Sequence, residues 1–417
     1  MDRFTGVIGL VVILLVAYLA SNNRKAIRWR TVGWGVVMQV CLGWLVISWQ
    51  AGADALKSFS DGITGAIAFS DEGAKFVFSW LADPAIGAQI SAKTGIPFSP
   101  FIFAFKVMPI VIFIASFFTI LYHLGIMQKV VEVFAVVMKK LLDVSGAESL
   151  AVAANIFIGQ TEAPIIIAPY INKMTMSELL TMMTGGMAHI SGAVLLAYAA
   201  MGIPASYLIT ASVMAAPATI VIAKMLRPET EEPETRGAVK VRIEKTHANV
   251  IEAASSGASQ GVSLAINIVG MLIAFIALIS LFNGFLGWVG AKAGMADLSL
   301  QWIFSRALWP LAWVMGVPAA DCATVAKLLG FKTVINEFVA YAEMSQVKTW
   351  ASEKSHLIAS FALCGFANFS SIGIQIGGIG GLAPARKSDI ARLGLWALLG
   401  GSLATFMSAT IAGILKG

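Results

Sequence analysis

Charged side chains are scarce in this sequence. Only 12% of its 417 residues are Asp, Glu, Lys or Arg, whereas 58% are hydrophobic, and the mean hydropathy is +0.81. A soluble globular protein carries about 25% charged residues, so this chain has too few to cover a soluble fold of its length. The composition therefore predicts an all-α polytopic membrane protein.

Cysteine and histidine are also rare. The three cysteines, Cys41, Cys322 and Cys364, lie far apart in apolar surroundings, which fits neither a disulfide framework nor a metal-ligand spacing. Since there are only four histidines, we expect no bound transition metal. We also expect no cofactor. The net charge of +6 is small, and membrane topology explains it better than a phosphate-binding surface does. Nucleic acid is therefore not an expected partner.

Long uncharged runs predict eight transmembrane helices, because a helix needs about 20 apolar residues to cross a bilayer. The run 179–223 is long enough for two helices and is interrupted by Gly202-Ile203-Pro204. The stretch 54–100 is less apolar and is expected to be external, with a short interfacial helix around 73–81. The predicted spans are residues 4–23, 31–53, 101–122, the pair in 179–223, 253–291, 355–385 and 393–415.

Basic residues cluster on one side of these predicted spans. The clusters lie at residues 24–30, 139–140, 224–245 and 386–392. Cytoplasmic loops carry an excess of Lys and Arg, so alternating crossings put all four clusters in the cytoplasm and both termini outside. The number of transmembrane crossings is eight if the apolar segments 143–175 and 307–345 do not cross the membrane.

Each of those two segments has a polar centre that breaks a helix. Residues 143–175 contain Gly159-Gln160-Thr161-Glu162-Ala163-Pro164, and residues 307–345 contain Asn336-Glu337-Phe338. A charged side chain at the bilayer centre costs at least about 2.5 kcal/mol, and broken backbone is tolerated there only inside protein or beside a water-filled cavity. We therefore predict two re-entrant hairpins. The flanking basic residues make the first one enter from the cytoplasm and the second from outside.

Each hairpin is followed by a span with a polar break, at residues 185–192 and 366–373, and then by an intact span. Two such copies entering from opposite sides are the inverted repeat of secondary transporters, whose binding site lies where the broken helices meet. The predicted organisation is a scaffold with three helices and the interfacial helix (1–142), a first transport repeat (143–227), a charged cytoplasmic linker (228–248), a long scaffold helix (249–300) and a second transport repeat (301–417).

The four polar breaks offer two carboxylates, amides and hydroxyls, but no Lys or Arg. Anionic substrates would be repelled, whereas a neutral polyhydroxylated solute, a sugar or a nucleoside, fits these donors and acceptors. An uncompensated carboxylate also attracts Na⁺ or a proton as a coupling ion. The same polar side chains are alternatively compatible with helix packing. His189 fits a buried neutral imidazole as well as it fits a proton-handling group.

Three motifs in these segments closely resemble the concentrative nucleoside transporter family. They are GQTEAP at 159–164, NEFVAY at 336–341 and GFANFSSIG at 365–373, and the hydropathy pattern is similar to that of the family over nearly the whole chain. The resemblance implies a transporter and not an enzyme, one that imports nucleosides by cation symport. It also implies a homotrimer in a bacterial inner (plasma) membrane, in which each transport domain moves like an elevator.

The resemblance further implies the residues of the site. The nucleobase would contact Gln160, Thr161, Glu162 and Val194, the ribose would contact Glu337, Phe366, Asn368 and Ser371, and Leu264 is a less distinctive match. The sodium site of the family, formed largely by backbone carbonyls, maps onto Asn155, Ile158, His189 and Ile190. The family commonly has Ser where this chain has His189, so Na⁺ and H⁺ are equally open as the coupling ion.

Two other functions remain open at this point. A passive nucleoside or sugar channel would use the same pocket. An intramembrane hydrolase would use Ser371, or the two glutamates, with His189, although an inverted repeat has no obvious use in such an enzyme. Uptake against a gradient separates a symporter from a channel.

Overall fold

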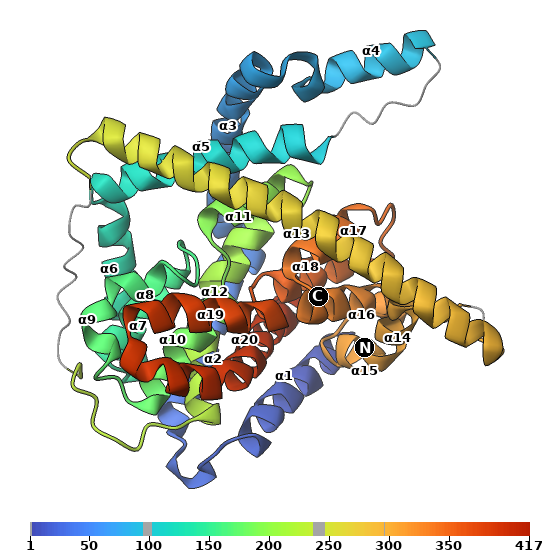
Figure 1. Ribbon diagram of the computed structural model, residues 1–417. Coiled ribbons are helices and arrows are strands. Elements are labelled where there is room, and N and C mark those ends of the chain that lie inside the picture. The colour runs from blue at the N-terminus through green and yellow to red at the C-terminus, as the bar shows by residue number, and fades with distance from the viewer. Residues whose placement is uncertain (1, 95–101, 237–246, 296) are drawn as a thin grey trace.

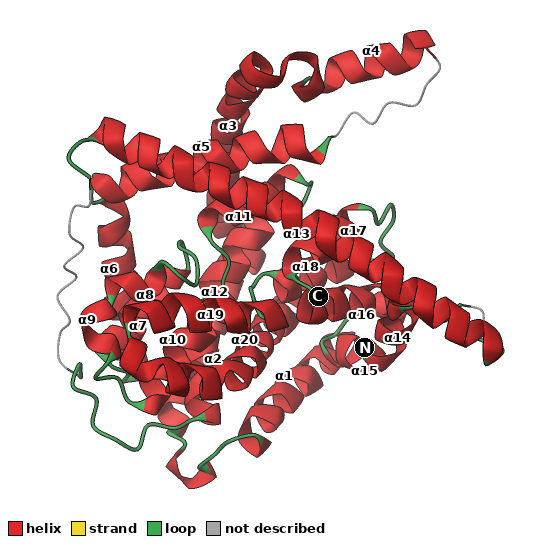
Figure 2. Ribbon diagram, viewed as in Figure 1, coloured by secondary structure: helices red, strands yellow, loops and turns green. Residues whose placement is uncertain are grey.

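The computed structural model describes residues 2–94, 102–236, 247–295 and 297–417, whose regular secondary structure is entirely helical (Figures 1 and 2). Six helical stretches in that part of the chain are long and apolar enough to cross a membrane: Trp29–Ser48, Ala104–His123, Met176–Ala200, Ala205–Leu226, Val250–Lys292 and Pro384–Lys416. Two shorter apolar helices, Phe4–Leu19 and Phe369–Leu382, lie in the predicted spans 4–23 and 355–385. The prediction of an all-helical membrane protein with several apolar spans is therefore confirmed.

Three long helices, α3 (Gln50–Phe78), α5 (Phe103–His123) and α13 (Val250–Lys292), form an arm along one side of the molecule (Figure 1). Helices α5 and α13 cross closely, because Ser116 Oγ donates a hydrogen bond to the Ala254 carbonyl (2.8 Å). A Cβ on Gly257 or Gly261 of α13 would approach atoms of α5 to 2.6 Å. Small residues let two membrane helices come this close, and α13 is the single long helix that the sequence predicted.

The prediction that residues 73–81 form a short, separate helix is wrong. Helix α3 is one continuous helix of 29 residues, and it ends where Ser79 adopts a φ of 52°. Its charged residues lower the hydropathy of the stretch, but most of them lie on exposed positions of the helix. Lys106 of α5 holds α3 through an ion pair with Asp71 (2.6 Å). Low hydropathy here therefore reflects the exposed positions of a long helix and not a short helix.

The first repeat has the predicted order of hairpin, broken span and intact span. The hairpin begins with α7 (Gly146–Asn155) and, after a break, continues through α8 (Ala163–Ile166) and α9 (Ala168–Ile171). Ser145 and Glu148 form a capping box at the start of α7. The broken span is α10 (Met176–Ala188) with α11 (Gly192–Ala200), and α12 (Ala205–Leu226) follows intact.

The second repeat has the same order. Its hairpin is α16 (Ala319–Val334) with α17 (Glu337–Ser345), its broken span is α18 (Glu353–Leu363) with α19 (Phe369–Leu382), and its last helix is α20 (Lys387–Lys416). The side chains of Asn336 and Asn368 accept hydrogen bonds from backbone amides in the first turns of α17 and α19. The residues that interrupt these segments are therefore also the N-caps of the helices that follow.

Helices α12 and α20 form the buried centre, with 89% and 83% of their most apolar windows inside the protein. Helix α1 (Asp2–Leu19) packs along α20, and α2 (Trp29–Gly43) packs along α12. Gln39 of α2 donates hydrogen bonds to the Met214 carbonyl (2.9 Å) and to Ser408 Oγ (3.0 Å). A Cβ on Gly6 would lie 2.7 Å from the Ile414 side chain, so the two termini are neighbours (Figure 1).

The described part of the charged linker is docked against the first hairpin. The Gly146 amide donates to the Thr235 carbonyl (2.8 Å), and Lys173 pairs with Glu234 (2.8 Å). Linker residues 237–246 lie outside the described residues. The remaining elements are α4 (Pro84–Thr94), α6 (Ile126–Leu142), α14 (Leu300–Ala307), α15 (Trp309–Val314), a π-helical turn (Trp44–Ser48) and 3₁₀ turns at Arg24–Ala26, Ser79–Ala82 and Pro384–Arg386.

Candidate functional site

The breaks of the two repeats meet at one point in the core. The Phe366 amide donates a hydrogen bond to the His189 carbonyl (3.2 Å), which joins the break of α18–α19 to the break of α10–α11. A Cβ on Gly365 would lie 2.9 Å from the carbonyl oxygens of Met187 and Ala188. Only a glycine lets the two backbones approach this closely. The polar groups that the breaks expose are thus gathered in one place.

Glu337 is the centre of the polar cluster in the second repeat. It begins α17, its exposure is 5%, and both of its carboxylate oxygens accept hydrogen bonds. Tyr198 donates its hydroxyl to Oε1 (2.8 Å), and Asn368 donates Nδ2 to Oε2 (3.1 Å). Because the Asn368 Oδ1 accepts from the Ser371 amide (2.9 Å), the cap of α19 also fixes the amide that holds the carboxylate.

The first hairpin is connected to the same cluster through Gln160. Its Nε2 donates to Ser371 Oγ (3.1 Å), and its Oε1 accepts from Gln375 Nε2 (3.2 Å). Gln375 also donates to the Met183 carbonyl of α10 (2.9 Å). The hydrogen bonds therefore run without interruption from Gln160 through Ser371, Asn368 and Glu337 to Tyr198, and they cross between the repeats. We call this chain of residues the inter-repeat network.

Two members of this neighbourhood were missed by the sequence analysis. Tyr198 lies in an apolar run of α11 with nothing around it to mark it as polar. Gln375 did leave a signal, because it is an amide in an apolar helix four residues after Ser371 and so lies on the same face. Both are fully buried, with an exposure of 0%.

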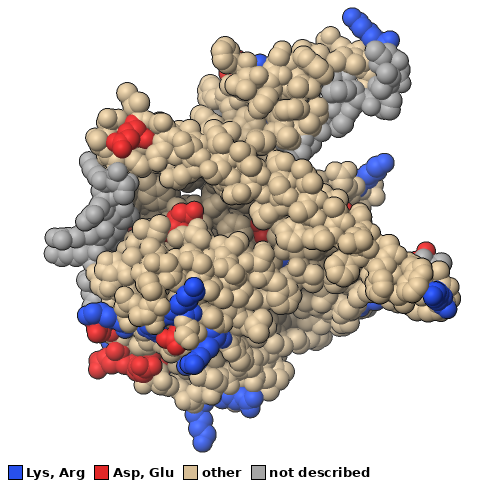
Figure 3. Space-filling view, viewed as in Figure 1, with Lys and Arg blue, Asp and Glu red and all other residues tan. Residues whose placement is uncertain are grey.

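Other predicted site residues lie outside the network and beside an open cavity. A cavity of about 370 Å³ is lined by Ile158, Glu162 and Leu264 among others, and none of its described lining residues is Lys or Arg. Glu162 is exposed, and a Cβ on Gly159 would collide with its carboxylate. Figure 3 shows acidic side chains beside the hollow beneath the crossing of α5 and α13. The volume is within the range of about 300–1,000 Å³ for small-molecule sites.

Three predicted residues make closer packing contacts. Thr161 lies against α19, where a Cβ on Gly378 would be 2.9 Å from its methyl group. Val194 is buried in the first turn of α11, and its amide donates to Ser191 Oγ (3.4 Å). Phe366 is half-buried between the network and the crossing of the breaks. All three lie on elements that meet at the site.

The residues predicted for the coupling ion converge on the first repeat. Asn155 Nδ2 donates to the Ala151 carbonyl (2.9 Å), and its buried Oδ1 has no hydrogen-bond partner in the described chain. His189 Nδ1 lies 2.8 Å from the Gly185 carbonyl, so this nitrogen carries the hydrogen. A Cβ on Gly185 would lie 3.1 Å from Asn155 Nδ2, so Asn155 of α7 packs against the residue of α10 whose carbonyl His189 contacts.

When the imidazole is neutral, its Nε2 is consequently the nitrogen that carries the lone pair. The backbone of Ser212 lies near the ring, but this nitrogen forms no well-aligned hydrogen bond within the described residues. Ile190 is fully buried beside it, whereas Ile158 faces the cavity. An amide oxygen, an imidazole lone pair and backbone carbonyls are acceptors, and such a set suits a cation or a proton. Among the described residues, His189 forms no hydrogen bond with Ser371, so these two do not form the nucleophile and base of a hydrolase.

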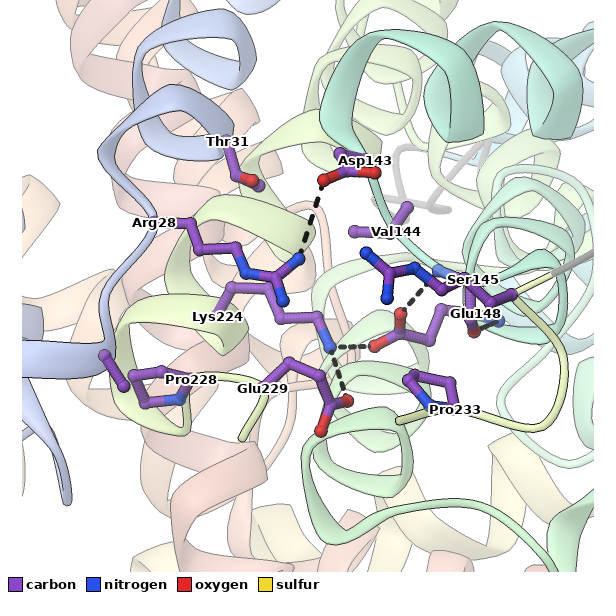
Figure 4. Close-up of a pocket in the computed structure, with 12 residues that line it drawn as sticks. Arg28, Thr31, Asp143, Val144, Ser145, Glu148, Lys224, Pro228, Glu229 and Pro233 are labelled. Atoms are coloured by element: carbon purple, nitrogen blue, oxygen red, sulfur yellow. Dashed lines mark hydrogen bonds and ion pairs between the residues drawn. The ribbon is translucent and has the colours of Figure 1, made fainter. Parts of the chain in front are cut away.

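A second polar cluster lies away from this site (Figure 4). Lys224, in the last turn of α12, forms ion pairs with Glu148 of α7 and with Glu229 of the linker (3.5 Å for the second pair). Arg28 pairs with Asp143 at the rim (3.5 Å). Lys224 and Glu148 are buried, so this cluster ties the linker, the first hairpin and α12 together without contributing to the inter-repeat network.

Comparisons with known proteins find similar proteins over nearly the whole length of the chain. Residues 8–81 and 207–413 match the families described as Na⁺ dependent nucleoside transporter N-terminus and C-terminus, and residues 104–205 match the family described as nucleoside recognition. An uncharacterized transporter of Haemophilus influenzae is 46% identical, with 100% of this chain and 99% of that protein covered.

A mammalian relative and a solved structure extend the comparison. The sodium/nucleoside cotransporter 2 of Rattus norvegicus is 40% identical over 98% of this chain, which spans 62% of the rat protein. The structure of CNTnw in an inward-facing substrate-bound state has a TM-score of 0.93 at 42% identity and covers 100% of both chains. The protein is therefore a transporter and not an enzyme, and it belongs to the concentrative nucleoside transporter family.

Proposed function

We propose that this protein imports nucleosides by symport with a cation, either Na⁺ or H⁺. The observation that supports this most directly is the inter-repeat network, which joins the tip of each hairpin through Gln160, Ser371, Asn368 and Glu337. A solute bound there contacts both repeats at once. The adjacent cavity has no Lys or Arg among its described lining residues, which favours a neutral solute.

Within this proposal the two ends of the network have different tasks. Glu337, Asn368 and Ser371 are the acceptors and donors for the ribose hydroxyls, with Phe366 alongside. The nucleobase contacts Gln160, Thr161 and Glu162, with Val194 beneath it. Leu264 of α13 closes the cavity on the side of the arm. Carboxylates and amides suit this division because they pair with hydroxyl groups and with the edges of a base. Since Glu337 and Asn368 already bond to each other, the ribose takes the carboxylate's remaining lone pairs.

The coupling ion is proposed to bind between α7 and the break of α10–α11, at Asn155, Ile158, His189 and Ile190. The free Oδ1 of Asn155 and the backbone carbonyls support Na⁺. The free Nε2 of His189 leaves a proton as the alternative coupling ion, because the lone pair of an imidazole nitrogen is an acceptor. Relatives described as sodium/nucleoside cotransporters favour Na⁺ by analogy.

The mechanism is proposed to be an elevator in a homotrimer. Eight crossing helices and two oppositely entering re-entrant hairpins would form each protomer, with both termini external and the membrane being a bacterial inner (plasma) membrane. Residues 143–227 and 301–417 would move as the transport domain, linked by 228–248. Residues 1–142 and 249–300 would form the scaffold, in which α1 and α2 lie along the transport repeats. The same order of hairpin, broken span and intact helix in both repeats supports this plan.

The test is uptake of radiolabelled uridine into proteoliposomes under separate Na⁺ and H⁺ gradients. Accumulation above the external concentration, driven by one of the two gradients, is the expected result. Uptake that stops at equal concentrations under both gradients would instead mean a passive channel. Stimulation by Na⁺ alone would remove the proton role of His189.

A further inference from the structure

Lys332 is a fully buried lysine that the proposed mechanism does not use. It lies in α16, two residues before the end of that helix, and its exposure is 0%. Its ammonium donates to the Ala362 carbonyl (2.7 Å) and to Thr405 Oγ1 (2.9 Å), and it lies 5.6 Å from the centre of the Phe406 ring. Both hydrogen-bond partners are neutral oxygens, which is the environment of a bound cation and not of an ordinary ion pair.

The Ala362 carbonyl has a specific reason to need this partner. It lies in the last turn of α18, and the residue four positions later, Phe366, donates its amide to the His189 carbonyl instead. The break of α18–α19 therefore leaves this carbonyl without its helical donor, at the negative end of the helix dipole. Lys332 satisfies it with a charged donor and holds α16 against the break.

Lys332 lies where the first helix of the second hairpin, the break of α18–α19 and the intact helix α20 meet. The first repeat has a corresponding corner, formed by its own hairpin, broken span and intact helix. There Asn155 belongs to the first helix of the hairpin, His189 to the break of the broken span and Ser212 to the intact helix α12. Ser212 Oγ donates to the Ile156 carbonyl (3.0 Å), which ties α12 to the hairpin. This corner keeps buried acceptors without partners, the Asn155 Oδ1 and the His189 Nε2. It is the corner proposed above for the coupling ion.

The corner of the second repeat is formed by α16, the break of α18–α19 and the intact helix α20, and a lysine ammonium occupies it. We infer that Lys332 is a covalently tethered cation in the place where the first repeat takes an exchangeable one. It is a positioning residue: it holds the second hairpin, and with it Glu337 five residues later, against the break without requiring a second ion. Lys332 and Glu337 are close enough to interact electrostatically. The inference rests on the proposed function, because it assigns the exchangeable ion to the first repeat.

The experiment is chemical rescue of Lys332→Ala, measured as uridine affinity by calorimetry on the purified protein. The substitution removes three methylenes and the ammonium, a group of the size of propylammonium. At a Na⁺ concentration and a pH that support full uridine binding by the parent, we expect the uridine affinity of Lys332→Ala to be about tenfold or more lower, a typical coupling between two sites. Propylammonium should restore it to within about threefold, and methylammonium should restore it less, since it fills less of the removed volume. Lys332→Arg, which keeps the charge, should need no amine.

Two controls separate charge from volume. 1-Propanol has nearly the same shape without the charge, so it should not restore binding. Lys327→Ala removes a part-exposed lysine from the same helix, one that pairs with Glu343 at 3.2 Å, and it should bind uridine as the parent does. If Lys332→Ala is recovered folded only when propylammonium is present during purification, that result also supports the tethered cation.

Three results would overturn the inference. They are unchanged uridine affinity in Lys332→Ala, rescue by 1-propanol as complete as rescue by propylammonium, and loss of binding or folding that no amine restores. Failure of the proposed function looks different, because the parent protein itself would then bind no uridine in any cation.

Discussion

Tyr198→Phe tests the inter-repeat network at the residue that the sequence did not reveal. The change removes one of the two hydrogen bonds to the Glu337 carboxylate and nothing else, since the ring keeps its contacts with Tyr341 (centroids 4.3 Å apart) and Phe338 (5.0 Å). A hydrogen bond to a charged group contributes about 1.5–3 kcal/mol, and about 1.4 kcal/mol is tenfold in Kd. Uridine binding should therefore weaken about 10- to 100-fold.

The assay compares uridine with 2′,3′-dideoxyuridine, which lacks the hydroxyls that Glu337 is proposed to hold. Tyr198→Phe should weaken uridine binding far more than dideoxyuridine binding, so the ratio of the two affinities falls. Tyr341→Phe is the matched control, because the Tyr341 hydroxyl donates to the Ser360 carbonyl (2.7 Å) and not to Glu337. It should lower thermal stability and leave the ratio unchanged. An unaltered ratio in Tyr198→Phe would refute the ribose assignment of Glu337.

Three further substitutions probe separate parts of the structure. Gln375→Leu removes the donor to Gln160, so uridine affinity measured by calorimetry should fall several-fold. An affinity equal to that of the parent would show that the hydrogen bond from Gln375 to Gln160 does not contribute to uridine binding. Gly365→Ala forces a methyl group against two backbone carbonyls, and overpacking of about 1–3 kcal/mol should appear as a lower midpoint of thermal unfolding; an unchanged midpoint would contradict the close crossing. Lys224→Met leaves Glu148 buried without its cation, at a cost of about 3–5 kcal/mol. The midpoint of thermal unfolding should therefore fall, while the ratio of uridine to dideoxyuridine affinity should stay as in the parent.

Much of the fold could be predicted because charge is expensive in a membrane. Glu162 and Glu337 stood out in apolar segments, and the glycines, prolines and asparagines around them marked helix breaks. The structure has its breaks at these positions. Asn336 and Asn368 show why the pattern was readable, since each is both the interruption and the cap of the next helix.

The parts that the sequence did not predict depend on tertiary contacts. The full length of helix α3 was missed because hydropathy separates buried from exposed segments and not helix from loop. Tyr198 was missed because its role arises from where α11 meets α17, and no local pattern reports that. The division of the site residues between the inter-repeat network and the cavity likewise depends on how the two repeats cross, which spacing along the chain does not encode.

The most direct measurement of the central claim is accumulation of uridine in proteoliposomes by Glu337→Gln beside Glu343→Gln. Both residues lie on α17, but Glu337 is buried in the network whereas Glu343 pairs with Lys327 nearer the surface. We expect Glu343→Gln to accumulate uridine like the parent and Glu337→Gln to accumulate none. Normal accumulation by Glu337→Gln, with the protein correctly folded, would contradict it.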